Sequence, residues 1–292
     1  MVRGGTRERW LVGVRYLFVM GIWLLAGAAG AEADDTEHRL GQGVTVAAGI
    51  GFDLTHGDYG DGADATAVTM PVTVAINPSE TVDLTLQIPL VYQTSRVGSS
   101  FVVYPSGGAG RRRNAPNVAQ GAISTTSTST VSEAGLGDIN LSAGWAVVHE
   151  GDLIPRIRAT AYLKLPSGDK DRGLGTGTFE GGPGLSVSKW FGDVQLFADG
   201  SYILQDSTYS YQGRNYLSYS VGGGLQTTDR LFVSLYAKGS SSRVDGGTAP
   251  VEGRLKVNFL QSRRVSWEVY GLAGFTEASP AVGGGLLVLY QF

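Results

Sequence analysis

The chain has 292 residues, a formal net charge of −3, 44 glycines and no cysteine. A net acidic chain lacks the basic face that nucleic-acid binding usually requires, and a chain without cysteine has no disulfide framework. The three histidines, His38, His56 and His149, are scattered along the sequence, so we predict no metal site and no cofactor.

The start of the chain has the features of a secretory signal peptide. The basic stretch MVRGGTRERW precedes an apolar run, LFVMGIWLLAGAAG, which is too short to span a bilayer comfortably and leads to the small residues 29–31. An uncleaved membrane helix is the alternative, which the short run and the preceding Arg15 disfavour. We therefore predict a signal peptide over residues 1–31, a short periplasmic segment over 32–42 and a folded domain over 43–292.

The rest of the chain alternates apolar and polar residues with a period of two, the pattern of β-strands that have two different faces. Twelve segments show it: 44–54, 68–76, 81–92, 138–148, 156–164, 185–188, 194–199, 217–225, 231–238, 254–259, 267–275 and 281–292. No continuous apolar run long enough for a transmembrane helix follows the signal peptide.

The connections between these segments alternate in length. Short ones (NPSE, HEGD, WFGD, QTTDR and QSRR) alternate with long ones near 55–64, 93–133, 166–181, 205–215, 239–251 and 276–281. This alternation is typical of outer-membrane barrels, whereas a soluble β-sandwich, the alternative, gives no reason for it. We predict an all-β, transmembrane, antiparallel up-and-down β-barrel of about 12 strands. It would lie in the outer membrane of a Gram-negative-type bacterium, with 95–131 as its longest extracellular loop.

Charged residues in the middle of these segments fall on the face opposite to the apolar one. A Lys or Arg that faced lipid at the bilayer midplane would cost roughly 2–4 kcal/mol, so we predict that the polar face lines the lumen. The lumen-lining candidates are Arg156, Arg158, Tyr162, Lys164, Phe197, Asp199, Tyr236, Arg254, Lys256, Glu268 and Tyr270. Rings of charge can select solutes, but charges in a small barrel can also pair and fill it, and the sequence leaves both open.

Three residues depart from this pattern. Lys189 falls on the apolar face, but it lies at a strand end where its ammonium group can reach the membrane interface. Leu287 and Leu289 fall on the inner face of the last segment, which predicts a packed rather than wet lumen beside that segment.

The chain ends in LVLYQF, so its last residue still belongs to the alternating pattern. We interpret Tyr290 and Phe292 as the signal that outer-membrane barrels present to their insertion machinery. Deletion of Phe292 should then impair assembly more than it alters flux. Together with Trp145, Trp190 and Phe191, both residues are also candidates for the aromatic girdles at the membrane interfaces.

Three motifs admit a binding or catalytic interpretation that we do not favour. GLGTG at 173–177 has the glycines of a phosphate loop but no strand-and-helix context, so we predict a flexible extracellular loop there. Arg111–Arg113 could bind lipopolysaccharide phosphates, but a solvated loop fits the low-complexity surroundings better. Asp53, His56 and Asp58 could serve a barrel hydrolase, yet no Ser–His geometry can be read, so we predict that the chain is not an enzyme.

Three glycine-rich stretches resemble a known family: GLGD at 135–138, LPSGD at 165–169 and LGTG at 174–177. It is the outer-membrane transporter family named for the MetA pathway of phenol degradation. The resemblance implies a barrel that passes small, often aromatic or hydrophobic, compounds, and it supplies no catalytic residues. We therefore predict a passive channel whose partners are outer-membrane lipid, the insertion machinery and a small-molecule solute. The alternatives are a structural or adhesive barrel that acts through its extracellular loops and, less favoured, a hydrolase.

Overall fold

The computed structural model describes residues 44–57, 65–96, 101–104, 108–111, 130–206, 213–243 and 246–292. The predicted signal peptide, the segment 32–42, most of loop 95–131, Asp58, Arg112 and Arg113 lie outside these ranges. Within the described ranges, no helix is long and apolar enough to cross a membrane.

The described residues form fifteen β-strands. They are β1 (Thr45–Gly57), β2 (Ala65–Asn77), β3 (Val82–Arg96), β4 (Phe101–Tyr104), β5 (Gly108–Arg111), β6 (Thr130–Leu136), β7 (Ile139–Val148), β8 (Arg156–Leu165), β9 (Glu180–Phe191), β10 (Val194–Gln205), β11 (Tyr216–Thr228), β12 (Leu231–Ser240), β13 (Val251–Leu260), β14 (Val265–Gly274) and β15 (Val282–Gln291). β4 and β5 form a separate hairpin, and the other thirteen belong to one antiparallel sheet. Because β6 and β7 pair in succession with the same neighbour, β3, they occupy a single position, and the described sheet has twelve strand positions.

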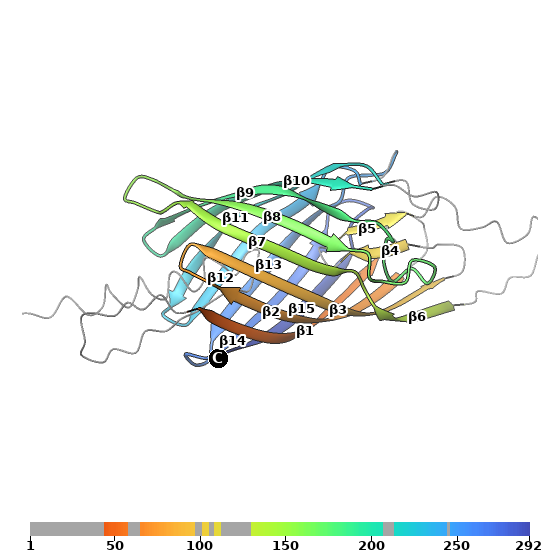
Figure 1. Cartoon of the computed structure of the whole chain (residues 1–292), viewed down its shortest axis with the longest axis horizontal. Coiled ribbons are helices and arrows are strands. Elements are labelled where there is room, and N and C mark those ends of the chain that lie inside the picture. Colours follow the sequence, from red (N-terminus) through yellow and green to blue (C-terminus); the bar gives the residue numbers. More distant parts are fainter. Residues whose placement is uncertain are drawn as a thin grey trace, which may run out of the picture.

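The sheet closes on itself because β1 pairs with β15, the last strand of the chain. The result is a barrel of strongly tilted strands (Figure 1). In hydrocarbon every backbone N–H and C=O needs an internal partner, and closure of the sheet removes the unpaired edges. The predicted antiparallel barrel of twelve strands is confirmed, and each of the twelve predicted segments overlaps one strand position.

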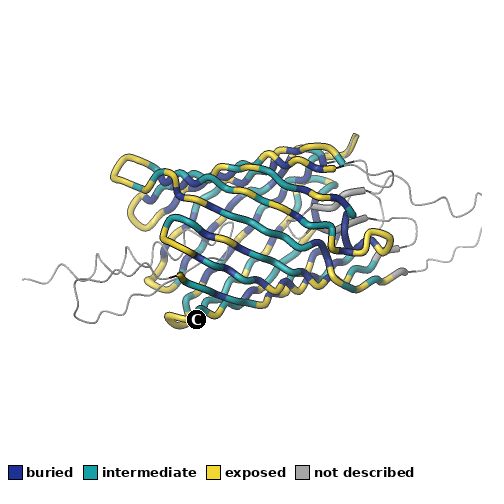
Figure 2. The backbone as a smooth tube through the Cα atoms, viewed as in Figure 1, coloured by how far each residue is buried: buried dark blue, intermediate teal, exposed yellow. Residues whose placement is uncertain are grey.

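Alternation along each strand gives the barrel two different faces. In β2, buried positions alternate with half-buried or exposed ones over the whole strand, and Figure 2 shows the same alternation around the barrel. The exposed positions carry many large apolar side chains, among them Ile50, Leu185, Val221, Leu235 and Leu255. The buried positions include many polar and charged side chains. This distribution is that of a barrel with lipid outside and a polar interior.

One end of the barrel carries the short connections and the C-terminus, and we call it the short-turn end (Figure 1). The end of the chain is held in the closing seam, because the N–H of Phe292 donates to Val46 O at 3.0 Å and that of Gln291 to Arg264 O at 2.8 Å. The rings of Tyr290 and Phe292 lie 5.2 Å apart. In outer-membrane barrels the short-turn end faces the periplasm, and the opposite, long-loop end faces the exterior.

The residues that departed from the charge pattern have local explanations. Lys189 reaches the short connection between β7 and β8, where its ammonium group donates to Glu150 Oε1 at 3.1 Å and to Gly151 O at 2.5 Å. Leu287 is buried on the inner face of the seam. Gly51, its cross-strand neighbour on β1, leaves room for this side chain, since a Cβ there would lie 3.3 Å from Leu287 Cδ1. The seam side of the lumen is therefore packed at Leu287, as predicted.

The assignment of Trp190 to an aromatic girdle is wrong. Its side chain is buried on the inner face at the short-turn end of β9, whereas the side chains of the adjacent Phe191 and of Trp145 on β7 are exposed. Trp190 therefore belongs to the lumen.

Candidate functional site

All eleven predicted lumen residues lie at inward-facing, buried or half-buried positions of their strands. They come from β8 (Arg156, Arg158, Tyr162, Lys164), β10 (Phe197, Asp199), β12 (Tyr236), β13 (Arg254, Lys256) and β14 (Glu268, Tyr270). Buried polar groups need hydrogen-bond partners. Most of their contacts fall into three polar networks and one aromatic group.

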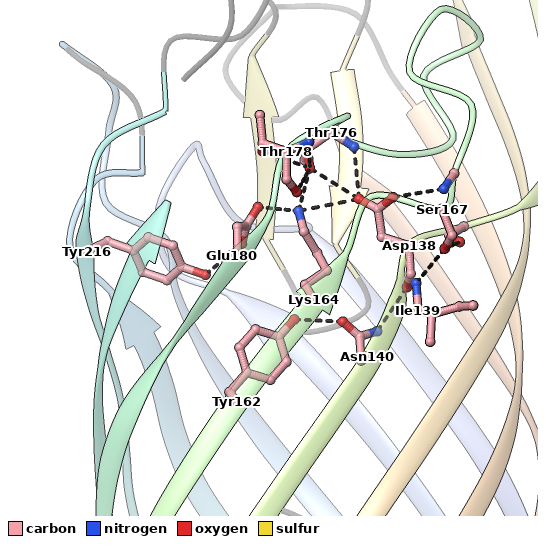
Figure 3. A network of polar contacts seen from close by, with 12 residues as sticks. Asp138, Ile139, Asn140, Tyr162, Lys164, Ser167, Thr176, Thr178, Glu180 and Tyr216 are labelled. Carbon is pink, nitrogen blue, oxygen red and sulfur yellow. Dashed lines mark hydrogen bonds and ion pairs between the residues drawn. The ribbon is translucent and has the colours of Figure 1, made fainter. Parts of the chain in front are cut away.

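The first network lies at the long-loop end, and we call Asp138, Lys164, Thr176, Thr178 and Glu180 the rim network (Figure 3). The ammonium group of Lys164 pairs with the Glu180 carboxylate, lies 3.3 Å from Asp138 Oδ2 and donates to Thr176 Oγ1 at 2.5 Å. Lys164 and Glu180 are each only 1% exposed. A buried charge is tolerated when charged and hydrogen-bonding partners surround it, and this network provides both.

The rim network continues along the wall on both sides. On one side, Tyr216 of β11 donates to Glu180 Oε2 at 3.2 Å, and the guanidinium of Arg243 lies 4.9 Å from the centre of the Tyr216 ring. On the other, Tyr162 donates to Asn140 Oδ1 at 2.6 Å beside Lys164 (Figure 3). Polar contacts therefore connect β7, β8, β9 and β11 with the β12–β13 connection at the same end of the barrel.

The connection between β8 and β9, residues 166–179, is attached to this network, and we call it the rim segment. The two carboxylate oxygens of Asp138 accept the backbone N–H groups of Gly168 at 3.0 Å and Thr176 at 2.9 Å. The Ser167 hydroxyl donates to Gly137 O at 2.9 Å and accepts the N–H of Ile139 at 2.9 Å. Both ends of the rim segment are thus bonded to the β6–β7 strand.

Residues 173–177, for which we predicted a flexible loop, are buried or half-buried against the barrel wall. Gly173 and Gly177 have φ angles of 72° and 70°, which glycine adopts without the penalty of other residues. Gly175 lies so close to Asp138 that a Cβ would collide with its carboxylate. The glycines therefore serve two backbone turns and a close approach, and the segment has one defined path.

The second network is the ion pair between Arg158 of β8 and Asp83 of β3. β7 lies between these two strands, and its residue Gly144 is the direct cross-strand neighbour of Asp83. A Cβ at Gly144 would collide with the Arg158 guanidinium. Glycine at this position therefore lets the arginine lie flat across the wall to its partner.

The third network lies on β13, β14 and β1. It contains two ion pairs and one hydrogen bond: Arg254–Glu252 at 2.7 Å, Lys256–Glu268 at 2.7 Å and Tyr270–Asp53 at 2.6 Å. The Tyr270 hydroxyl reaches Asp53 across β15, where a Cβ at Gly285 would collide with both side chains. A lumen glycine again makes room for a contact between the strands on either side.

The lumen charges in these networks are paired. Each of Arg158, Lys164, Arg254 and Lys256 has a carboxylate within salt-bridge distance. Of the two interpretations that the sequence left open, paired charges describe these four cations, and a ring of free charge does not.

The aromatic group consists of Trp190, Phe197, Phe232 and Tyr236, all buried on the inner face of β9, β10 and β12. The rings of Trp190 and Phe232 are 5.8 Å apart, and those of Phe197 and Tyr236 are 5.9 Å apart. β11 passes between β10 and β12 with glycines at 222 and 224, where a Cβ would collide with Tyr236 and Phe232, respectively. The aromatic side chains therefore meet over a strand that has no side chains at those points.

Four polar side chains beside the aromatic group have buried atoms without a hydrogen-bond partner among the described residues. The atoms are Nε2 and Oε1 of Gln195, Oε1 of Gln226, Oγ of Ser234 and Nδ2 of Asn258. The strand register places them close together, because Gln195 pairs with Gly224, which pairs with Ser234, and Phe232 pairs with both Gln226 and Asn258. This part of the lumen, near the short-turn end, combines apolar rings with unused hydrogen-bonding capacity.

The hydrolase hypothesis gains no geometric support. His56 lies on the outer face, where Nδ1 is 3.0 Å from Thr66 Oγ1. Asp53 lies on the inner face and bonds to Tyr270, so the two side chains point to opposite sides of β1. Among the described residues, no group of three or more His, Asp or Glu side chains is placed to hold a metal ion.

Sequence reasoning missed Glu180, Thr176 and Gln195. Glu180 is the first residue of β9, where the glycines at 181, 182 and 184 interrupt the alternating pattern. Thr176 lies in a connection, to which no strand periodicity applies. Gln195 carries a signal, because it alternates with the outward Val194 and Leu196, but an uncharged amide gives no reason of its own to expect a functional role.

Comparison with known proteins gives a sequence family and structural likenesses to solved outer-membrane proteins. The sequence model of the family described as "Putative MetA-pathway of phenol degradation" matches residues 57–259. An outer membrane channel from Pseudomonas putida F1 has a TM-score of 0.62 and 12% identity, over 89% of this chain and 100% of that chain. The translocator domain of autotransporter NalP from Neisseria meningitidis has a TM-score of 0.44 and 14% identity, over 88% of this chain and 90% of that chain. No curated protein matches the chain in sequence. The first structural likeness shows that the fold is that of an outer-membrane β-barrel.

Proposed function

Because the chain belongs to the family described as the putative MetA pathway of phenol degradation, we propose that it is a passive outer-membrane channel for small solutes with an aromatic or hydrophobic body. The observation that carries the proposal is the aromatic group, four buried rings on an inner wall that is otherwise largely polar. Binding sites for small molecules combine apolar and aromatic walls with a few polar groups, and this region has both.

The paired charges support the proposal that the channel passes uncharged solutes. Ring-shaped arrays of one charge attract or exclude ions, but the four cations in the networks are each matched by a carboxylate. An uncharged molecule meets no strong field from such pairs, and contact with aromatic rings favours an aromatic solute. Passage is driven by the concentration gradient of the solute, and lumen width, the paired charges and the aromatic group act as the selecting elements.

Single-channel recording in planar bilayers tests the proposal with catechol and cyclohexanediol, two uncharged diols of similar size of which only the first is aromatic. We expect an ion current through the purified protein and interruption of that current by catechol at lower concentrations than by cyclohexanediol. Trp190→Ala and Phe232→Ala should each reduce this difference roughly two- to tenfold, the range of one aromatic contact. Trp145→Ala, on the outer face, is the matched control and should leave it unchanged.

Two results would count against the proposal in different ways. A protein that passes neither ions nor either solute is not a channel. A channel that both diols block equally well, before and after Trp190→Ala, has no selective aromatic wall.

A further inference from the structure

The rim segment lies against the inside of the barrel wall. Its Leu174 is only 4% exposed, and it packs where Gly135 of β6 has no side chain, since a Cβ there would lie 2.8 Å from Leu174 Cδ1. Gln93, on the inner face of β3, donates to the carbonyl oxygens of Arg172 and Gly173 at 3.4 and 3.1 Å. The segment therefore adds a second layer inside β3, β6 and β7 at the long-loop end.

Asp138 is the residue that bonds both ends of the rim segment to the barrel wall. One of its oxygens accepts the N–H of Gly168 and the other that of Thr176, so a single carboxylate bonds the segment near its start and near its end. Hydrogen bonds to an ionised carboxylate are about twice as strong as those between neutral groups. Lys164, 3.3 Å away, balances the charge of Asp138 and bonds Thr176 through its hydroxyl (Figure 3).

The position of Asp138 in the strand explains how one side chain reaches both points. β3 pairs with β6 up to Leu136 and with β7 from Asn140 onward, and one extra residue on the β6–β7 side forms a bulge at Gly137 and Asp138. A bulge re-aims side chains and increases local twist. Gly137 and Asp138 are both buried as a result, and the carboxylate turns to the rim segment.

We propose that Asp138 and Lys164 set the size limit of the channel by clamping the rim segment inside the extracellular mouth. They act as positioning residues, because they hold the segment and do not themselves need to touch the solute. The motifs GLGD, LPSGD and LGTG then act together, because GLGD supplies Asp138, and LPSGD and LGTG supply Gly168 and Thr176, whose backbone N–H groups it holds. The size-limit statement rests on the proposed channel function, whereas the clamp itself does not.

The absence of cysteine from the chain allows a direct test of the clamp. In the full-length protein, Leu174→Cys places a single thiol at the buried point of the rim segment, and Lys170→Cys places one at its exposed turn. The rate of maleimide labelling in lipid vesicles then reports how often the segment leaves the wall. We expect Leu174→Cys to react slowly and Lys170→Cys to react quickly.

Two independent variants should release the segment. Asp138→Asn in the Leu174→Cys background weakens both backbone bonds and the contact with Lys164, and should raise the labelling rate roughly tenfold or more. Gly175→Ala puts a methyl group against Asp138 and Gly168 without removing any charge, and should act in the same direction. Asp83→Asn, at another buried lumen carboxylate outside the rim segment, is the control and should leave the labelling rate unchanged.

The size limit of the channel can be measured on the same proteins, from the mass of poly(ethylene glycol) at which the polymer is excluded from the conducting pore. Asp138→Asn and Gly175→Ala should admit larger polymers than the parent protein, and Asp83→Asn should not. If Leu174→Cys reacts as fast as Lys170→Cys in the parent, or if both variants leave the labelling rate unchanged, there is no clamp. If labelling accelerates but the polymer limit stays constant, the clamp exists and does not set the size limit. If the parent conducts no current, the channel function fails while the labelling result still decides the clamp.

Discussion

The residues around the rim network and the polar residues beside the aromatic group differ in how their buried polar atoms are bonded. At the long-loop end, none of the ten residues labelled in Figure 3 has a buried side-chain nitrogen or oxygen without a hydrogen-bond partner. Near the short-turn end, Gln195, Gln226, Ser234 and Asn258 all have one or more such atoms beside the rings of Trp190 and Phe232.

This difference indicates that the two regions have different roles, one structural and the other in contact with the solute. An unsatisfied buried polar group costs roughly 1–3 kcal/mol, so a region whose task is to keep one shape gains by bonding all of them. A surface that must hold a passing solute briefly gains by keeping bonding capacity unused. The rim network is therefore a fixed frame, and the aromatic group with its polar neighbours is the part of the wall at which we expect solutes to be selected.

The largest effect should follow from breaking the frame at its centre. Lys164→Met leaves Glu180 and Asp138 buried without their cation, and removing one partner of a buried ion pair costs roughly 3–5 kcal/mol. Urea titration of the protein in vesicles measures this loss in the free energy of unfolding. Lys170→Met, an exposed lysine of the same rim segment, should stay within about 0.5 kcal/mol. Equal losses for the two lysines would contradict the view of the rim network as the frame.

A smaller loss is expected from crowding the aromatic group. Gly224→Ala places a methyl group against the Phe232 ring, and overpacking of this kind costs roughly 1–3 kcal/mol. The ring must shift, which disturbs its contact with Trp190, so the preference for catechol over cyclohexanediol should fall as well. Gly200→Ala on β10 is the matched control, because its Cβ meets no atom within 4 Å. A variant that lost stability but kept its preference for catechol would show that these rings do not select the solute.

The same substitution, glutamine to methionine, can be made beside the rim segment and beside the aromatic group. Gln93→Met removes the two bonds that Nε2 donates to the rim segment, together with an Oε1 that has no partner among the described residues, and should lower the free energy of unfolding by up to about 1 kcal/mol. Gln195→Met removes an amide that is 0% exposed and whose polar atoms have no partner among the described residues. Loss of an unsatisfied group should leave stability unchanged or raise it by about 1 kcal/mol, and catechol should bind less well. The opposite order of stability would contradict the comparison.

The barrel itself could be predicted because contact with lipid restricts which residues can occupy the outer face of each strand. Charges are costly on the outer face, so Arg156, Arg254 and the other mid-strand charges mark the inner face without knowledge of any contact. The same alternation places Leu185 and Val187 outward and Trp190 inward, and its assignment to a girdle followed its residue type instead of its register.

The rim segment could not be predicted, because its order depends on a partner from another strand. In the sequence, the glycines around 173–177 are compatible with a mobile loop and with a tightly folded one. Only the position of Asp138, set by the bulge after β6, decides between them. The sequence also does not reveal the unpaired atoms of Gln195, since the hydrogen bonding of an amide depends on side chains from other strands.

The smallest effect should come from the outermost contact of the rim segment. Arg172 Nε lies 2.7 Å from Glu133 Oε2, but the two side chains are 49% and 31% exposed. Exposed ion pairs contribute roughly 0–1 kcal/mol because water and salt screen them, so Arg172→Ala should change the free energy of unfolding by less than about 1 kcal/mol. In the Leu174→Cys background it should also leave the labelling rate close to that of the parent. A double-mutant cycle with Glu133→Ala measures the pair directly, and a coupling as large as that of Lys164 with Glu180 would mean that the segment is held from outside the lumen as firmly as from within.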